Sequence, residues 1–192
     1  MDKLQECALA FKEMLNIQYN ITLGRKGKTT SIALTFSESD FHHLCGLHKI
    51  IDNDYLRTTK RSQVFDDIIK GKLSFQTLSN SSYFEQVEIR IDPLIAIEQM
   101  LDADNLIFRY NDKVGKFSLI LAEYLLSTSH KDREVYVFID KHPTGQYFCR
   151  SFFPKGNKDY TVGQARHTVL YKEKLNLASG ENKIQIDKLT PL

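Results

Sequence analysis

The stretch "REVYVFIDKHPTGQYFCRSFFP", residues 133–154, sets the fold class. Residues 133–140 are rich in β-branched and aromatic side chains and predict a strand. Pro143-Thr144-Gly145 is typical of a turn, and residues 146–154 predict a second strand. We therefore expect two neighbouring strands here, with residues 155–164 forming a polar loop after them.

Further strands are expected on both sides of this pair. Strands are predicted at 105–111 and 116–126, and 167–177 fits either a strand or a helix. The last residues, 178–192, are polar and are expected to form a loosely attached tail.

The N-terminal half is predicted to be mainly helical. The runs Tyr19–Leu23 and Ser31–Phe36 flank a polar, glycine-bearing segment and predict a β-hairpin. Ser37 with Asp40 three residues later matches the start of a helix. Apolar spacing predicts further helices at 2–16, 61–71, 73–80 and 93–101, the last opened by Pro93.

This order of elements predicts an α+β fold. N-terminal helices and a β-hairpin should pack on a mostly antiparallel sheet of four to six strands. We expect one domain over residues 1–177, followed by the tail 178–192.

Composition excludes several classes of protein. The 192 residues carry a net charge of +2, which gives no strong field for nucleic acid or membranes, although a local basic cleft is compatible with it. Three cysteines do not make a disulfide framework and favour a reducing, cytoplasmic compartment. The N-terminus does not resemble a signal peptide, no apolar run is long enough to span a membrane, and no cofactor motif is present.

The segment "FHHLCGLHKI", residues 41–50, holds three histidines and has three interpretations. On a continuous helix, His48 would point toward the core or a cleft beside it, His43 would lie at the edge, and His42 would face solvent. Cys45 and His48 have a spacing that can chelate zinc, but the chain offers no second ligand pair, so we predict no metal. Burial without chemistry and acid–base catalysis stay open. Gly46 hints at close approach of another backbone or a ligand.

A second polar segment follows the strand at 146–154. Strand alternation places Cys149, Ser151 and Phe153 on one face, and Arg150 and Phe152 on the other. Cations that neutralise phosphate and hydroxyls that orient its oxygens are what a phosphodiester site needs, whereas a solvated loop explains the same composition. The candidates beyond the strand are Lys155, Lys158, Tyr160, Gln164 and Arg166.

Both segments resemble motifs of one nuclease family. "FHHLCGLHKI" resembles an F-x-H-L-x-G-L-x-K element, and "SFFPKGNKDYTVGQ" resembles an S-F-F…Y…Q element. They are found in the phage-type barnase–EndoU–colicin–RelE-like nucleases, in the fourth phage-associated subgroup. The resemblance covers roughly residues 19–177. It implies helices against a four-stranded antiparallel sheet, and metal-independent RNA cleavage by a toxin or phage effector.

Site roles follow from this resemblance and from the residue chemistry. The predicted catalytic residues are His43, Lys49, Ser151, Tyr160 and Gln164. The predicted substrate-binding residues are Arg150, His48, Lys155, Lys158 and Arg166. The expected activity is an endoribonuclease that uses 2′-hydroxyl attack, with RNA as partner and with room for a cognate inhibitor protein. The alternative is a catalytically inactive binding or regulatory module of the same fold.

Overall fold

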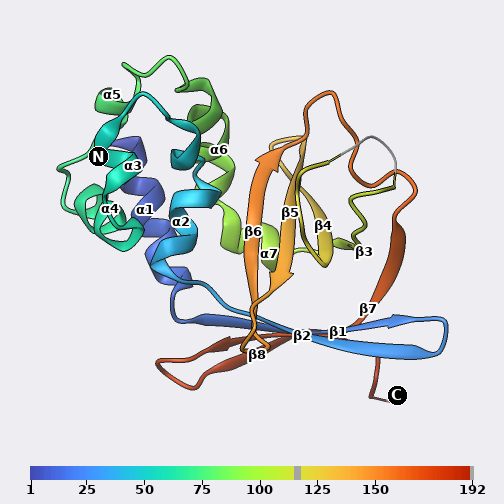
Figure 1. Ribbon diagram of the computed structural model, residues 1–192. Helices are drawn as coiled ribbons and strands as arrows, with labels where there is room; N and C mark the ends of the chain where they lie inside the picture. The colour runs from blue at the N-terminus through green and yellow to red at the C-terminus, as the bar shows by residue number, and fades with distance from the viewer. Residues whose placement is uncertain (115–117, 191–192) are drawn as a thin grey trace.

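The computed structural model describes residues 1–114 and 118–190 (Figure 1). Within these ranges it contains seven α-helices, a short 3₁₀ helix (η1) and eight strands. The helices are α1 (Lys3–Met14), α2 (Glu38–Leu44), η1 (Leu47–Lys49), α3 (Asp54–Thr58), α4 (Arg61–Ile69), α5 (Phe75–Leu78), α6 (Glu85–Ile95) and α7 (Ile97–Asp102). The strands are β1 (Ile17–Arg25), β2 (Lys28–Leu34), β3 (Leu106–Arg109), β4 (Tyr124–His130), β5 (Arg133–Lys141), β6 (Tyr147–Pro154), β7 (Ala165–Asn176) and β8 (Asn182–Asp187).

The strands form one sheet that closes on itself. Their order is β1-β2-β6-β5-β4-β3-β7-β8, and β1 also pairs with β7, so seven strands make a closed ring and β8 adds to β7. The α+β class is confirmed, and all pairs except β2–β6 are antiparallel. The predicted sheet of four to six strands was wrong. The β1–β2 hairpin lies within the sheet, because β1 pairs with β7 from the far end of the sequence.

Two apolar clusters occupy the two faces of the central strands. On β5, Val135 and Val137 belong to the large core shared with the helices, whereas Tyr136 and Phe138 belong to a smaller cluster on the other face. This alternation is the usual result of strand geometry. Figure 1 shows most of the helices gathered beside β6. The smaller cluster includes Tyr160, which therefore lies on the sheet face away from the large core.

Local sequence explains where several elements begin and end. The predicted capping box is present, because Ser37 N donates to Asp40 Oδ2 at 2.7 Å at the start of α2. The helix predicted to open at Pro93 begins instead at Glu85, and Pro93 lies within α6. Apolar and polar residues alternate over 87–92 as in a strand, but Val87, Ile91 and Leu94 are buried at helical spacing.

The C-terminal residues extend the sheet. Asn182–Asp187 forms β8, which pairs with β7, in the segment for which the sequence predicts a loose tail. The ambiguous segment 167–177 lies mostly in β7. Of the strand predicted at 116–126, residues 116 and 117 lie outside the described ranges, 118–122 form no strand, and β4 begins at Tyr124.

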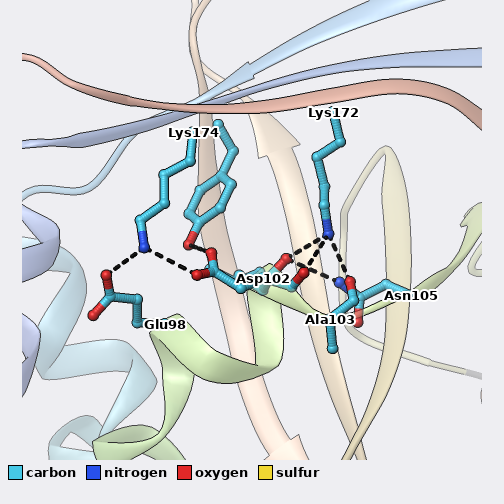
Figure 2. Close-up of polar contacts among 8 residues, drawn as sticks. Glu98, Asp102, Ala103, Asn105, Lys172 and Lys174 are labelled. Carbon is cyan, nitrogen blue, oxygen red and sulfur yellow. Dashed lines mark hydrogen bonds and ion pairs between the residues drawn. The ribbon is translucent and has the colours of Figure 1, made fainter. Parts of the chain in front are cut away.

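Two lysines of β7, one buried and one partly buried, join the closed sheet to α7 (Figure 2). Lys172 of β7 is 2% exposed, and its Nζ donates to the carbonyl oxygens of Leu101, Asp102 and Ala103 at 2.9, 3.1 and 2.6 Å. These carbonyls belong to the C-terminal end of α7, where a helix lacks internal donors and where a cation is favoured. Lys174 bonds to Asp102 Oδ2 at 3.0 Å and to Glu98.

Among the described residues, no helix combines the length and the apolar character that crossing a membrane would require.

Candidate active site

A pocket of about 690 Å³ lies where the helical part of the molecule meets β6. In Figure 1, α2 and α6 stand beside β6. The pocket is lined from α2 and η1, from α6, from β6, and from the loops at 118–121 and 155–164. Its polar lining residues are His43, His48, Lys49, Gln86, Arg90, Ser118, Arg150, Ser151, Lys158 and Tyr160.

The pocket is strongly cationic although the whole chain is nearly neutral. Lys49, Arg90, Arg150 and Lys158 line it, and no carboxylate does among the described residues. Within residues 1–114 and 118–190, no ion pair involves the first three of these cations. Unpaired cations around one cavity favour a polyanionic ligand, since they concentrate positive potential there.

Gly46 sets the direction of the histidines. The predicted helix does not continue, because α2 ends at Leu44 and Gly46 adopts a φ of +84°, which favours glycine. The chain then turns into η1, so His48 is exposed at the pocket and His43 is half-buried in it. Their ring centroids are 4.7 Å apart. The predicted outward position of His42 was wrong, since its side chain is 5% exposed.

Both pocket histidines are neutral at pH 7. Removal of water lowers the pKa of His43 to about 4, and positive neighbours that include Arg61 and Arg150 add to this effect. Removal of water, then His43 and Lys49, lowers the pKa of His48 to about 3. His48 is the more exposed of the two residues, so water screens these charges more strongly there than at His43.

A β-bulge turns two consecutive residues of β6 toward the pocket. Phe138 pairs with Ser151 and Ile139 pairs with Cys149, so Arg150 has no partner on β5. The predicted alternation is broken at this point: Arg150 and Ser151 both line the pocket, while Cys149 and Phe152 both lie in the large core. Ser151 and Phe152 nevertheless lie on opposite faces, as the alternation predicts.

Asp159 organises the loop that presents Tyr160 and Lys158. Its Oδ1 accepts hydrogen bonds from Thr161 N at 2.9 Å and Thr161 Oγ1 at 2.6 Å, and its Oδ2 accepts from Lys155 Nζ at 2.6 Å. The Tyr160 ring packs 5.3 Å from that of Phe138 in the smaller apolar cluster. The loop is therefore anchored on the sheet while Tyr160 and Lys158 line the pocket.

Three predicted site residues lie outside this lining. Lys155 is held by Asp159 and by Glu134, whose Oε2 accepts from Nζ at 2.7 Å. Gln164 clamps the backbone of Asn111, with hydrogen bonds of 2.9 and 3.0 Å to its N and O. Arg166 lies on β7 and borders a different hollow. The other seven predicted residues meet at the pocket: His43, His48, Lys49, Arg150, Ser151, Lys158 and Tyr160.

Of the described residues that line the pocket, sequence reasoning missed three polar ones, Gln86, Arg90 and Ser118, and Arg90 is the charged one among them. It lies on α6 and is 7% exposed. The only signal in the sequence is an arginine at a position where the spacing of Val87, Ile91 and Leu94 predicts burial, and recognising it required the boundaries of α6.

The zinc interpretation finds no ligand cluster. In residues 1–114 and 118–190, no group of three or more histidine, cysteine or acidic side chains could hold a metal ion. Cys45 is fully buried and does not line the pocket beside His48.

A cationic pocket lined by neutral imidazoles and hydroxyl groups is typical of proteins that bind phosphate esters. The chain belongs to the phage-Barnase-EndoU-ColicinE5/D-RelE like nuclease4 family, which it matches over residues 3–189. The predicted resemblance is therefore confirmed. No curated protein and no solved structure matches the chain.

Proposed function

We propose that the protein is a metal-independent endoribonuclease of the toxin or phage effector type, and that this pocket is its active site. One observation supports the proposal most strongly. His43 and Ser151, which are far apart in the sequence, line the same cavity together with four cations and no carboxylate among the described residues. A scissile phosphate between an imidazole and several cations is suited to in-line attack by a neighbouring hydroxyl.

In the proposed reaction, His43 takes the proton from the 2′-hydroxyl of the RNA. The 2′-oxygen then forms a bond to the adjacent phosphorus, and the bond to the 5′-oxygen breaks. Lys49 and Arg150 stabilise the extra negative charge of the pentavalent state, and Ser151 donates a hydrogen bond to a phosphate oxygen. The products are a 2′,3′-cyclic phosphate and a 5′-hydroxyl.

We assign proton donation to the leaving 5′-oxygen to Tyr160. Both imidazoles are neutral at pH 7, so neither carries a spare proton. Burial raises the pKa of Tyr160, which keeps its hydroxyl protonated at neutral pH. Gln164 has a positioning role in this proposal, because it clamps the backbone at Asn111, next to the loop that approaches the pocket.

The test compares His43→Ala with the unchanged protein on a defined RNA in excess EDTA. We expect cleavage by the variant to be about 10²- to 10⁴-fold slower, the usual contribution of a general base. The products are examined for 2′,3′-cyclic phosphate ends. His142→Ala is the matched control, since His142 is exposed in the β5–β6 turn and does not line the pocket.

Equal cleavage by His43→Ala and the unchanged protein would remove His43 from the mechanism. RNA binding without any cleavage by the unchanged protein would favour the alternative of a binding or regulatory module.

A further inference from the structure

Among residues 1–114 and 118–190, Arg90 is a buried cation with no carboxylate partner. It is 7% exposed and lines the pocket from α6. Its Nε is buried without a hydrogen-bond partner, and among the described residues no ion pair or hydrogen bond of this side chain is found. Burying an unpaired charge is costly, so a bound group of opposite charge would stabilise such a side chain.

The surroundings of Arg90 hold it in place without neutralising it. The guanidinium lies 5.7 Å from the centroid of the Phe153 ring. On another side it packs against Gly46, where an added Cβ would overlap Nη1. Lys49 and Arg150 line the same pocket and add positive charge. The side chain is thus packed and preorganised, and an anion in the pocket would supply the opposite charge.

We infer that Arg90 is a binding residue for a phosphate oxyanion at the floor of the pocket. In the proposed endoribonuclease, on which this part of the inference rests, the oxyanion is a phosphate of the RNA strand. The planar guanidinium fork suits two oxygens of one phosphate, and hydrogen bonds to an ion are stronger than neutral ones in a site with little water.

The experiment measures binding of two probes at constant ionic strength. One probe is inorganic phosphate, followed by the shift it causes in melting temperature. The other is a labelled 2′-deoxy oligonucleotide, which lacks the attacking hydroxyl and so cannot be cleaved by the proposed reaction. The proteins are the unchanged chain, Arg90→Met and Arg90→Lys. Arg57→Met is the control, since Arg57 lies on α3, pairs with Asp54 and does not line the pocket.

For Arg90→Met we expect dissociation constants for both probes to rise roughly 10- to 100-fold, because a charge-assisted pair of hydrogen bonds is lost. The melting temperature without phosphate should be equal or higher, since methionine fills similar volume without a buried charge. For Arg90→Lys we expect a rise of about 10-fold, because the charge stays and the fork is lost. Arg57→Met should bind as the unchanged chain does.

Unchanged phosphate binding in Arg90→Met would overturn the inference. If that variant does not fold, unchanged binding in Arg90→Lys overturns it in the same way. Loss of inorganic phosphate binding alone would mean that Arg90 serves free phosphate, and the assignment to a nucleic-acid strand would be overturned.

Repeating the binding measurements in a His43→Ala background separates this inference from the proposed function. If Arg90 controls phosphate binding while His43→Ala cleaves RNA as fast as the unchanged protein, the proposed mechanism fails and the anion site stands.

Discussion

At the scale of single residues, the low pKa of His43 predicts an unusual pH profile. A general base must be unprotonated, and the pKa of this imidazole is about 4. We therefore expect kcat/KM for RNA cleavage to stay level through the neutral range and to fall as the pH drops through about 4. Initial rates at low substrate concentration across this range give the profile. A midpoint near the ordinary histidine pKa of about 6.5 would contradict the assigned environment.

Folding must be followed in the same samples, since the same pKa shift affects stability. Unfolded His43 binds a proton at its ordinary pKa near 6.5, whereas folded His43 does so only near about 4. The contribution of His43 to stability is therefore complete above about pH 6.5 and is lost as the pH falls toward 4. His43→Gln should show a smaller loss of unfolding free energy across that window, as measured by urea titration.

Sequence reasoning identified residues by their chemistry better than by their direction. His43, Lys49 and Ser151, which were chosen from the two motifs for their chemistry, line one pocket. The direction of His42 was wrong, because α2 packs against α4 as well as against β6, and the sequence of one helix does not show how many neighbours cover it. Arg90 was not predicted as a site residue. Whether a helical residue is buried or exposed can be predicted only when the bounds of its helix are known, and those of α6 were not.

At the scale of elements, Gly46 lies in the turn between α2 and η1. Gly46→Ala should destabilise the protein. Its φ of +84° disfavours any residue with a side chain. A Cβ would also lie 2.9 Å from the carbonyl oxygen of Gln86 on α6 and would displace Arg90. We expect a loss of about 2–4 kcal/mol in unfolding free energy, measured by urea titration.

Gly27→Ala is the matched control for this substitution. Gly27 also has positive φ, +74°, but a Cβ there meets nothing within 4 Å. Its cost should be about 1–2 kcal/mol, which reflects the backbone alone. Equal losses in the two variants would show that the contact of Gly46 with α6 contributes nothing.

The bulge in β6 shows what alternation cannot predict. The strand itself was foreseen from its aromatic residues, and Phe152 was correctly expected to point away from Ser151. A single unpaired residue, Arg150, shifts the phase of the strand, and this brings two neighbouring side chains to one pocket. Bulges depend on the register with the partner strand, which local sequence does not determine.

At the scale of the whole molecule, Lys172 joins the closed sheet to the helices, and Lys172→Met should be strongly destabilising. Its Nζ serves three carbonyl oxygens at the end of α7, and the methionine variant leaves them buried without this donor. We expect a loss of about 2–4 kcal/mol in unfolding free energy by urea titration. Lys183→Met, an exposed position on β8, should change it by less than about 0.5 kcal/mol. Similar effects at both positions would contradict the structural role of Lys172.

The closure of the sheet into a ring could not be predicted from the sequence. Strands and helices carry local periodic signals, and most were recognised. The pairing of β1 with β7 brings together residues far apart in the sequence, such as Ile17 and Asn176. The local sequence of neither strand identifies the strand with which it pairs. The short parallel contact between Leu34 and Tyr147 completes the ring with a single register pair. Both links depend on how the whole chain packs.

Closure also has a consequence for the order of events on the ribosome. The β1–β2 hairpin emerges from the ribosome early. The other edge of β1 stays unpaired until β7 is synthesised, after nearly all the other elements. Until then the nascent chain displays an unpaired strand edge, and such edges attract intermolecular pairing. β6 and the loop of Tyr160 are also late to emerge. The pocket is therefore assembled only near the end of translation, so a half-finished chain cannot present its complete lining.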